Sequence, residues 1–337
     1  MAITVPEPSP PRPAPQPRRV EPGLEPSDRW FQAGSTAIGW SVLVITGAVG
    51  VFLGVQSVPT LRHYGLNFFT TVEWNPQFDR IGIAAVLLGT VEVAFVAMVV
   101  AFPLALGFAL FISDYAPRWA KGWLVSAIDL MAAVPSIIYG LWGFYLLKPH
   151  AINLSRWLSQ HFGWFPLFHV NTDPNAAVWQ QSQYTSSAFI AGLAVSMMAI
   201  PLACAVMRAV FDQAPIGERE AALALGGTRW GVIRKVVLPF GKGGIIGGSM
   251  LALGRALGET AAVAIILSPA YLLSPRILQS GAQTTSALIA GNFGSATRSQ
   301  LSALLTAGFV LFLITLAVNS TAAFVISRSR SGASTEI

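Results

Sequence analysis

Two opposite charges lie four residues apart in an apolar stretch of the sequence. Arg255 is the only Lys or Arg in the middle of a long hydrophobic run, since Arg208 lies in the last turn of its run, and Glu259 follows one helical turn after Arg255. A cation at the middle of a membrane helix costs about 2.5–3.5 kcal/mol, so this arginine is expected to be either functional or paired. Its planar fork holds two oxygens of an oxyanion at once, whereas an i,i+4 pair with Glu259 neutralises both charges. The sequence leaves both interpretations open.

Other polar side chains in the hydrophobic runs are few. Ser136 and Tyr139 offer hydroxyl groups to a solute or to packing, and Glu92 and Asp129 bring the carboxylates in these runs to three against one arginine. That balance is poor for attracting an anion. We therefore expect tight capture to belong to an external protein, with only weak contact along this chain. We assign Glu92 no role beyond a hydrogen bond to a neighbouring helix.

Composition and charge indicate an integral membrane protein. Of 337 residues, 53% are hydrophobic and 11% are charged, against about 25% charged in soluble domains. Six apolar runs each exceed the roughly 20 residues that cross a bilayer. The predicted spans are Gly34–Val55, Ile81–Ile112, Trp123–Leu147, Ser187–Phe211, Gly243–Leu267 and Leu301–Ile326. The sequence thus predicts an all-α protein with six transmembrane helices.

Lys and Arg set the expected orientation. Of the 21 basic residues, fourteen fall on the side that holds both termini, six on the other side, and Arg255 within a span. The positive-inside rule therefore places both ends in the cytoplasm. The net charge of +6 reflects topology, and nucleic-acid binding is not expected. The four histidines lack metal-ligand spacing, and the single Cys204 excludes an internal disulfide.

A charged segment between the fourth and fifth spans stands out from this background. Residues 212–241 read as two short helices, with Glu218 and Glu220 in the first turn of the first helix, where carboxylates favour the positive helix end. Gly226 permits a bend, Thr228 caps the second helix, and Pro239 ends it. A smooth, alanine-rich helix with a leucine knob suits a groove on a partner protein. Gly241-Lys242-Gly243 lacks the spacing of an ATP-binding P-loop, so energy must come from elsewhere.

This segment resembles the coupling motif of binding-protein-dependent ABC importer permeases. The motif is written EAA, a glycine four residues on, and then I-x-L-P, with Val236 here in place of isoleucine. The resemblance implies a type I (MetI-like) permease core whose coupling segment, 214–239, enters a cleft on a cytoplasmic ATPase. The residues expected to carry coupling are Glu220, Ala221, Ala222, Leu225, Gly226, Leu238 and Pro239.

Three further stretches are similar to signatures of phosphate-specific permeases of the PstC type. They are Gly254–Val263, Ala133–Gly143 and Thr285–Gly294. The resemblance covers about residues 81–326. It implies import of inorganic phosphate, with Arg255, Glu259, Ser136 and Tyr139 along the substrate pathway. It also implies four partners besides lipid: a PstA-like second permease, two copies of a PstB-like ATPase that bind ATP and Mg²⁺, and a PstS-like phosphate-binding protein. This chain itself is expected to hold no cofactor or metal and to be no enzyme.

The expected organisation is a Pro-rich cytoplasmic tail (1–32), a first span with its exterior loop (33–80), the permease core (81–327) and a C-terminal tail (328–337). Two alternatives remain. One is a permease of the same architecture for sulfate, molybdate or phosphonate. The other is an ATP-independent channel, which would not need the coupling segment. A membrane enzyme is disfavoured because the spans show no Cys/His cluster.

Overall fold

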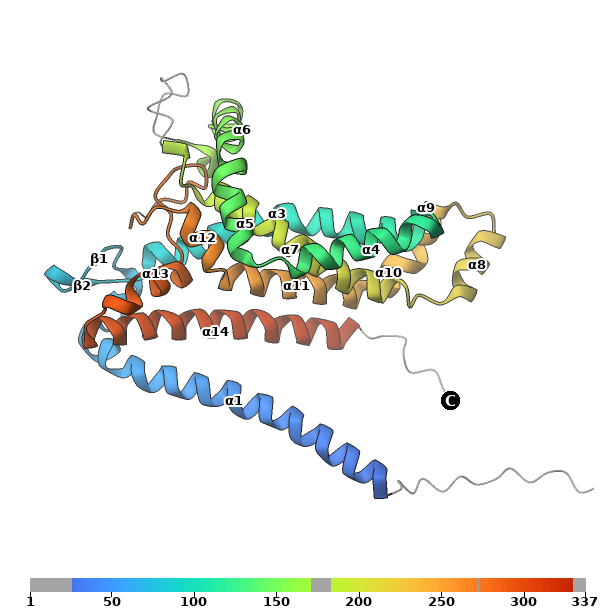
Figure 1. The fold of residues 1–337 in the computed structure, drawn as a ribbon, viewed down its shortest axis with the longest axis horizontal. Coiled ribbons are helices and arrows are strands. Elements are labelled where there is room, and N and C mark those ends of the chain that lie inside the picture. The colour runs from blue at the N-terminus through green and yellow to red at the C-terminus, as the bar shows by residue number, and fades with distance from the viewer. Residues whose placement is uncertain (1–25, 171–182, 272, 330–337) are drawn as a thin grey trace, which may run out of the picture. The chain divides into compact units, whose positions relative to one another are not determined.

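The computed structural model describes residues 26–170, 183–271 and 273–329 (Figure 1). Residues 1–25 of the predicted Pro-rich tail (1–32) therefore lie outside the described residues. The chain divides into two units, Met1–Val49 and Gly50–Ile337. Helix α1, Pro26–Tyr64, runs from the first unit into the second and begins earlier than the span predicted at Gly34.

Four helices are long and apolar enough to cross a membrane. They are α1, α3 (Ala84–Leu110), α7 (Ala188–Phe211) and α14 (Arg298–Ser329). Two further pairs of helices, each bent at a break, pass the same test, so the described residues hold four spans, or six if each bent pair counts as one. Six predicted spans are compatible with this arrangement.

Close helix packing depends on glycines in the second unit, where α3, α7 and α11 (Lys242–Gly258) lie together (Figure 1). A Cβ atom at Gly192 would lie 2.6 Å from the Cβ of Val96, which joins α7 to α3. A Cβ at Gly244 would lie 2.6 Å from the Cβ of Val210, which joins α11 to α7. Small residues allow such close approach of helices in lipid.

The third predicted span is not one kinked helix. Helix α4, Arg118–Ala133, ends before Pro135, and the chain turns by 92° into the helical run that begins with α5, Ser136–Trp142. The residue before a proline is driven into extended backbone, and Val134 has ψ 129°. By contrast, Pro103 and Pro201 lie inside uninterrupted helices. The run continues through α6, Lys148–Phe162, so the first part of the predicted exterior loop is helical.

The fifth predicted span, Gly243–Leu267, is also interrupted. Helix α11 ends at Gly258, Glu259 is extended with ψ 126°, and α12 covers Ala261–Ile266. Helix α13 covers Thr285–Asn292, and its first four residues are buried. The remaining helices and strands are α2 (Asn67–Thr70), β1 (Trp74–Asn75), β2 (Arg80–Ile81), α8 (Ile216–Ala224), α9 (Arg229–Val232) and α10 (Leu238–Phe240). The two strands form an antiparallel hairpin after α1.

We predict that Gly244→Ala lowers the stability of the bundle, because the added methyl group would overlap Val210 across the α7–α11 contact. Overpacking of this kind costs about 1–3 kcal/mol. Gly247→Ala is the matched control on the same helix, since its Cβ would meet only the end of Ile326 at 3.7 Å. Thermal unfolding of the two variants in detergent measures the difference. Equal unfolding midpoints of the two variants would show that the α7–α11 contact accommodates the added methyl group without loss of stability.

Candidate functional site

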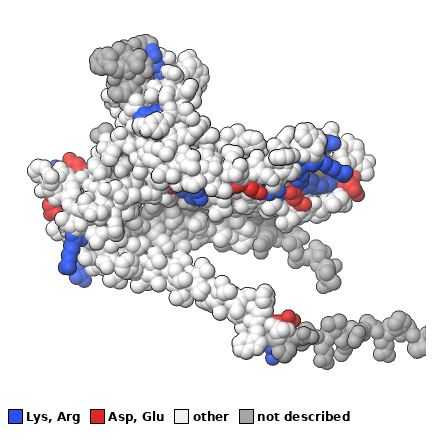
Figure 2. All heavy atoms as spheres, in the orientation of Figure 1, with Lys and Arg blue, Asp and Glu red and all other residues white. Residues whose placement is uncertain are grey.

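Helix α8 and the turn after it form the most exposed segment of the described chain that carries a predicted motif. Leu225 is 90% exposed, Ile216 71% and Leu223 48%. Charged side chains gather over α8–α10, whereas most of the remaining surface in the same view is uncharged (Figure 2). An apolar tip in a charged surround is unusual for a surface that meets only water, and it is typical of a contact site.

Local sequence explains the shape of this segment. Gly226 has φ +82°, a conformation that residues with a side chain rarely adopt, and it reverses the chain after α8. The Thr228 hydroxyl accepts a hydrogen bond from Gly231 N and caps α9, as predicted. Two details differ from prediction. Glu220 lies beyond the first turn of α8, and Pro239 lies inside α10, so that Gly241 ends the helical run instead.

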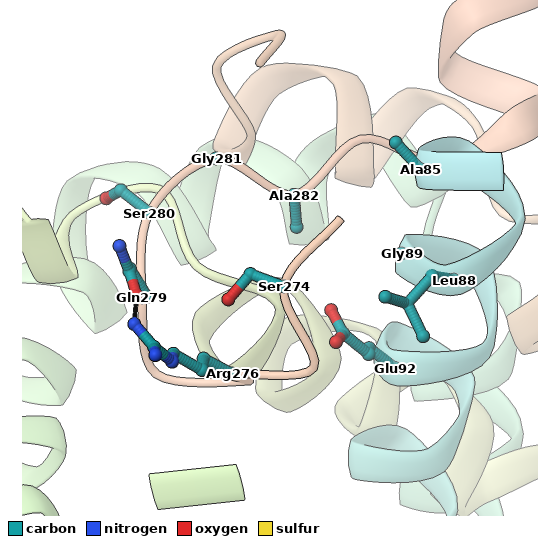
Figure 3. Close-up of a pocket in the computed structure, with 10 residues that line it drawn as sticks. All are labelled: Ala85, Leu88, Gly89, Glu92, Ser274, Arg276, Gln279, Ser280, Gly281 and Ala282. Atoms are coloured by element: carbon teal, nitrogen blue, oxygen red, sulfur yellow. Dashed lines mark hydrogen bonds between the residues drawn. The ribbon is translucent and has the colours of Figure 1, made fainter. Parts of the chain in front are cut away.

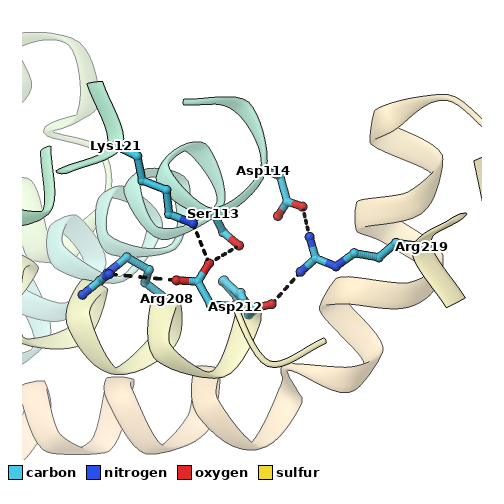
Figure 4. A network of polar contacts seen from close by, with 7 residues as sticks. Ser113, Asp114, Lys121, Arg208, Asp212 and Arg219 are labelled. Carbon is cyan, nitrogen blue, oxygen red and sulfur yellow. Dashed lines mark hydrogen bonds and ion pairs between the residues drawn. The ribbon is translucent and has the colours of Figure 1, made fainter. Parts of the chain in front are cut away.

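Arg219 fastens α8 to the bundle (Figure 4). Its Nη1 donates to Asp114 Oδ1 at 2.5 Å, and its Nη2 donates to the carbonyl oxygen of Phe211 at 2.5 Å. Both side chains of the ion pair are largely shielded from solvent. A π-helical turn, Phe111–Tyr115, carries Asp114 at the end of α3. One arginine thus joins α8 to the ends of both α3 and α7.

A second ionic cluster lies beside this pair (Figure 4). Asp212 accepts hydrogen bonds from Lys121 Nζ at 2.9 Å and from Ser113 Oγ at 3.1 Å, and Arg208 lies 3.9 Å away. It therefore links α4, the end of α3 and the end of α7. Sequence reasoning missed these residues as well as Asp114 and Arg219. The only sequence signal for these contacts was that charged residues follow the ends of the second and fourth apolar runs.

The pairing of Arg255 with Glu259, one of the two interpretations that the sequence leaves open, is not among the ion pairs of the described residues. Because α11 ends at Gly258, the two residues no longer share one helical turn. The Glu259 carboxylate is buried and accepts a hydrogen bond from Ala262 N, which caps α12. Arg255 is exposed, and its Nη2 lies 3.2 Å from Met198 Sδ on α7.

The other two predicted pathway residues, Ser136 and Tyr139, lie on α5. Tyr139 is buried and donates its hydroxyl hydrogen bond to the carbonyl of Met131 at 2.8 Å, so the hydroxyl is committed to the helix break. Ser136 is partly exposed, and Asp129 is exposed on α4. Among the described residues, no group of three or more His, Cys, Asp or Glu side chains fits a metal ion.

Comparison with known proteins decides the family. Residues 101–331 match the family model described as "Binding-protein-dependent transport system inner membrane component". The match spans α8 and its anchors as well as Arg255 and Glu259. The chain belongs to this family. It is accordingly a multi-pass component of a transport system in the inner membrane.

Curated relatives of this membrane component cover nearly its whole length. A phosphate transport system permease protein PstC of Xylella fastidiosa is 39% identical over 87% of this chain and 88% of its own. PstC 2 of Mycobacterium tuberculosis is 37% identical over 88% of this chain and 90% of its own. A solved bacterial ABC transporter for import of the acidic polysaccharide alginate shares the fold, with a TM-score of 0.54 at 17% identity over 89% of this chain and 98% of its own.

We predict that Asp114→Asn loosens the attachment of α8, because it leaves the Arg219 guanidinium without its charged partner. Hydrogen bonds to charged groups contribute about 1.5–3 kcal/mol, so the free energy of local opening of α8 should fall by that amount. Hydrogen exchange of the α8 backbone amides measures it. Lys121→Gln is the control, since it removes an ion pair that does not involve α8. Equal exchange in both variants would contradict an anchoring role for Asp114.

Proposed function

We propose that this chain is one of two unlike permease subunits of an ATP-driven importer of inorganic phosphate. The relatives named phosphate transport permease proteins, with high coverage of both chains, support the substrate. The observation that carries the mechanism is the geometry of α8. Its tip, Leu225, is 90% exposed, while its base is held by Arg219 to the ends of two long helices.

In this proposal α8 acts as a lever. Leu225 and the Ala221–Ala222 surface enter a cleft on a cytoplasmic ATPase, and the residues 214–239 move with that subunit. The Arg219–Asp114 ion pair passes the displacement to α3, and the Phe211 carbonyl contact passes it to α7. Leu238 and Pro239 connect the segment to α11, which carries Arg255. The partner ATPase binds ATP and Mg²⁺, and this chain holds no cofactor.

Arg255 is the proposed contact for phosphate. An exposed guanidinium on a membrane helix is costly unless it meets water, a partner or a solute. Its release from Glu259 leaves the planar fork with only the Met198 sulfur, a weak acceptor, in the described chain. Arg255 with Ser136 and Tyr139 therefore borders a pathway that the second permease completes. This contact needs only a low affinity for phosphate, because an external phosphate-binding protein supplies the tight binding.

The orientation of the chain in the membrane follows from the proposed contact between α8 and the ATPase. The segment α8–α10 must face the ATPase, so its end of the bundle lies in the cytoplasm, where the count of Lys and Arg in the sequence also places both termini. The hairpin β1–β2 then lies at the exterior end. This assignment agrees with the excess of Lys and Arg on the α8 side of the sequence.

We predict that Glu220→Lys releases the ATPase from the purified complex while the two permeases stay together, because reversal of a charge beside the lever tip disfavours docking. Glu218→Lys is the matched control, an exposed glutamate two residues earlier on the same helix. Affinity purification in mild detergent, followed by quantification of the co-eluting subunits, measures the loss. Retention of the ATPase by the Glu220 variant would contradict a docking role for this face of α8.

Uptake of labelled phosphate under phosphate starvation tests the substrate. Cells that lack other phosphate carriers should accumulate phosphate only when this chain is present. Uptake that survives its deletion would favour the same architecture acting on sulfate, molybdate or phosphonate. Uptake that persists after removal of the ATPase would favour a channel.

A further inference from the structure

One face of α3 lies against the loop that precedes α13. A Cβ atom at Gly89 would lie 2.3 Å from the carbonyl oxygen of Gln283, so the loop backbone rests directly on the helix. Ala85, Leu88 and Glu92 recur with Gly89 at helical spacing and line one pocket with the loop residues 274–282 (Figure 3). Glu92 thus points out of α3 toward this loop, at the end of the bundle opposite α8 (Figures 1 and 3).

One oxygen of the Glu92 carboxylate receives no hydrogen bond from the described residues. The side chain is buried, with 7% exposure, and its Oε1 has no hydrogen-bond partner in the described structure. A buried acceptor without a donor is unfavourable, and a charged one is more so. The pocket that it lines has about 20 Å³ of room for the centres of water molecules. One water needs about 10–15 Å³ by this measure, so the pocket as a whole has room for little more than one oxygen-sized group.

The loop side of the same pocket offers donors. Arg276 lines the pocket and is partly exposed. Its Nη1 donates a hydrogen bond to the neutral Gln279 Oε1 at 3.2 Å. Figure 3 shows the Arg276 side chain directed toward Gln279 rather than toward Glu92. Ser274, also partly exposed, adds a hydroxyl between the two walls. A guanidinium in the wall disfavours a metal cation, while a carboxylate at the buried end disfavours a fully deprotonated anion.

We propose that this pocket binds a protonated oxyanion, with one O–H group inserted toward Glu92 Oε1 and the remaining oxygens facing Arg276 and Ser274. In its ionised form the Glu92 carboxylate only accepts hydrogen bonds, so this form selects an oxygen that carries a proton. Inorganic phosphate keeps at least one O–H proton near neutral pH, whereas sulfate has none. The inference rests on the proposed phosphate import, and it assigns to Glu92 the rejection of sulfate at the exterior end of this permease.

Direct binding tests the proposal apart from transport. The purified transporter in lipid nanodiscs, without the external binding protein, is titrated with inorganic phosphate, and the ³¹P linewidth reports weak binding. We expect broadening that arsenate, which is also protonated, reverses and that sulfate does not. Broadening that sulfate and arsenate reverse equally well, or no broadening, overturns the proposal. Uptake by the same preparation is scored separately, so that failure of phosphate import is distinguished from failure of this site.

Two variants locate the selectivity. Glu92→Gln replaces an acceptor with an amide that also donates, so the preference for arsenate over sulfate as competitor should fall by about tenfold or more. Arg276→Gln should reduce the broadening itself. Glu73→Gln is the matched control, because Glu73 is an exposed glutamate paired with Arg80 away from this pocket. An unchanged arsenate-to-sulfate ratio in Glu92→Gln overturns the proposal even if that variant binds phosphate.

Discussion

Every backbone polar group that lies in lipid must find a partner within the protein, and this constraint governs where the helices of this chain break. An uninterrupted helix satisfies its own backbone, but each break leaves donors and acceptors that side chains must replace. The break after α11 is stabilised in this way. Glu259 Oε1 accepts from Ala262 N, and Ser286 Oγ donates to the carbonyl of Glu259 at 2.6 Å. At the α4–α5 break, the Tyr139 hydroxyl supports the carbonyl of Met131.

These hydrogen bonds at the helix breaks bear on the excess of carboxylates over arginine in the predicted spans. Glu259 is committed to a helix end, so it does not compete with a solute for Arg255. Arg255 is left on an exposed face with only the Met198 sulfur beside it. The apparent excess of carboxylates over cations is therefore no obstacle to an anion at this point. Among the described carboxylates, Glu92 in α3 and Asp114 just after it each have a buried oxygen that receives no hydrogen bond.

At the other end of the bundle, a small number of ionic contacts separates a rigid base from an exposed tip. Arg219 joins α8 to the ends of α3 and α7, and Asp212 ties those ends to Lys121 of α4. Beyond this base, Leu225 has almost no contact with its own chain. A lever needs this division, because a tip that flexed at its base would absorb the displacement instead of passing it on.

Much of the architecture was readable from sequence because the signals are local. Apolar runs longer than a bilayer predict helices, and the Gly226, Thr228 and EAA pattern predicts the exposed α8–α9 turn and its likeness to ABC importer permeases. Contacts between distant residues were not readable. The Asp114–Arg219 pair joins positions 105 residues apart, and the Glu92 pocket brings α3 against a loop some 190 residues later. The separation of Arg255 from Glu259 depended on a helix end after Gly258. At that end Ala262 and Ser286 supply hydrogen-bond partners for Glu259, and only the tertiary fold brings Ser286 there.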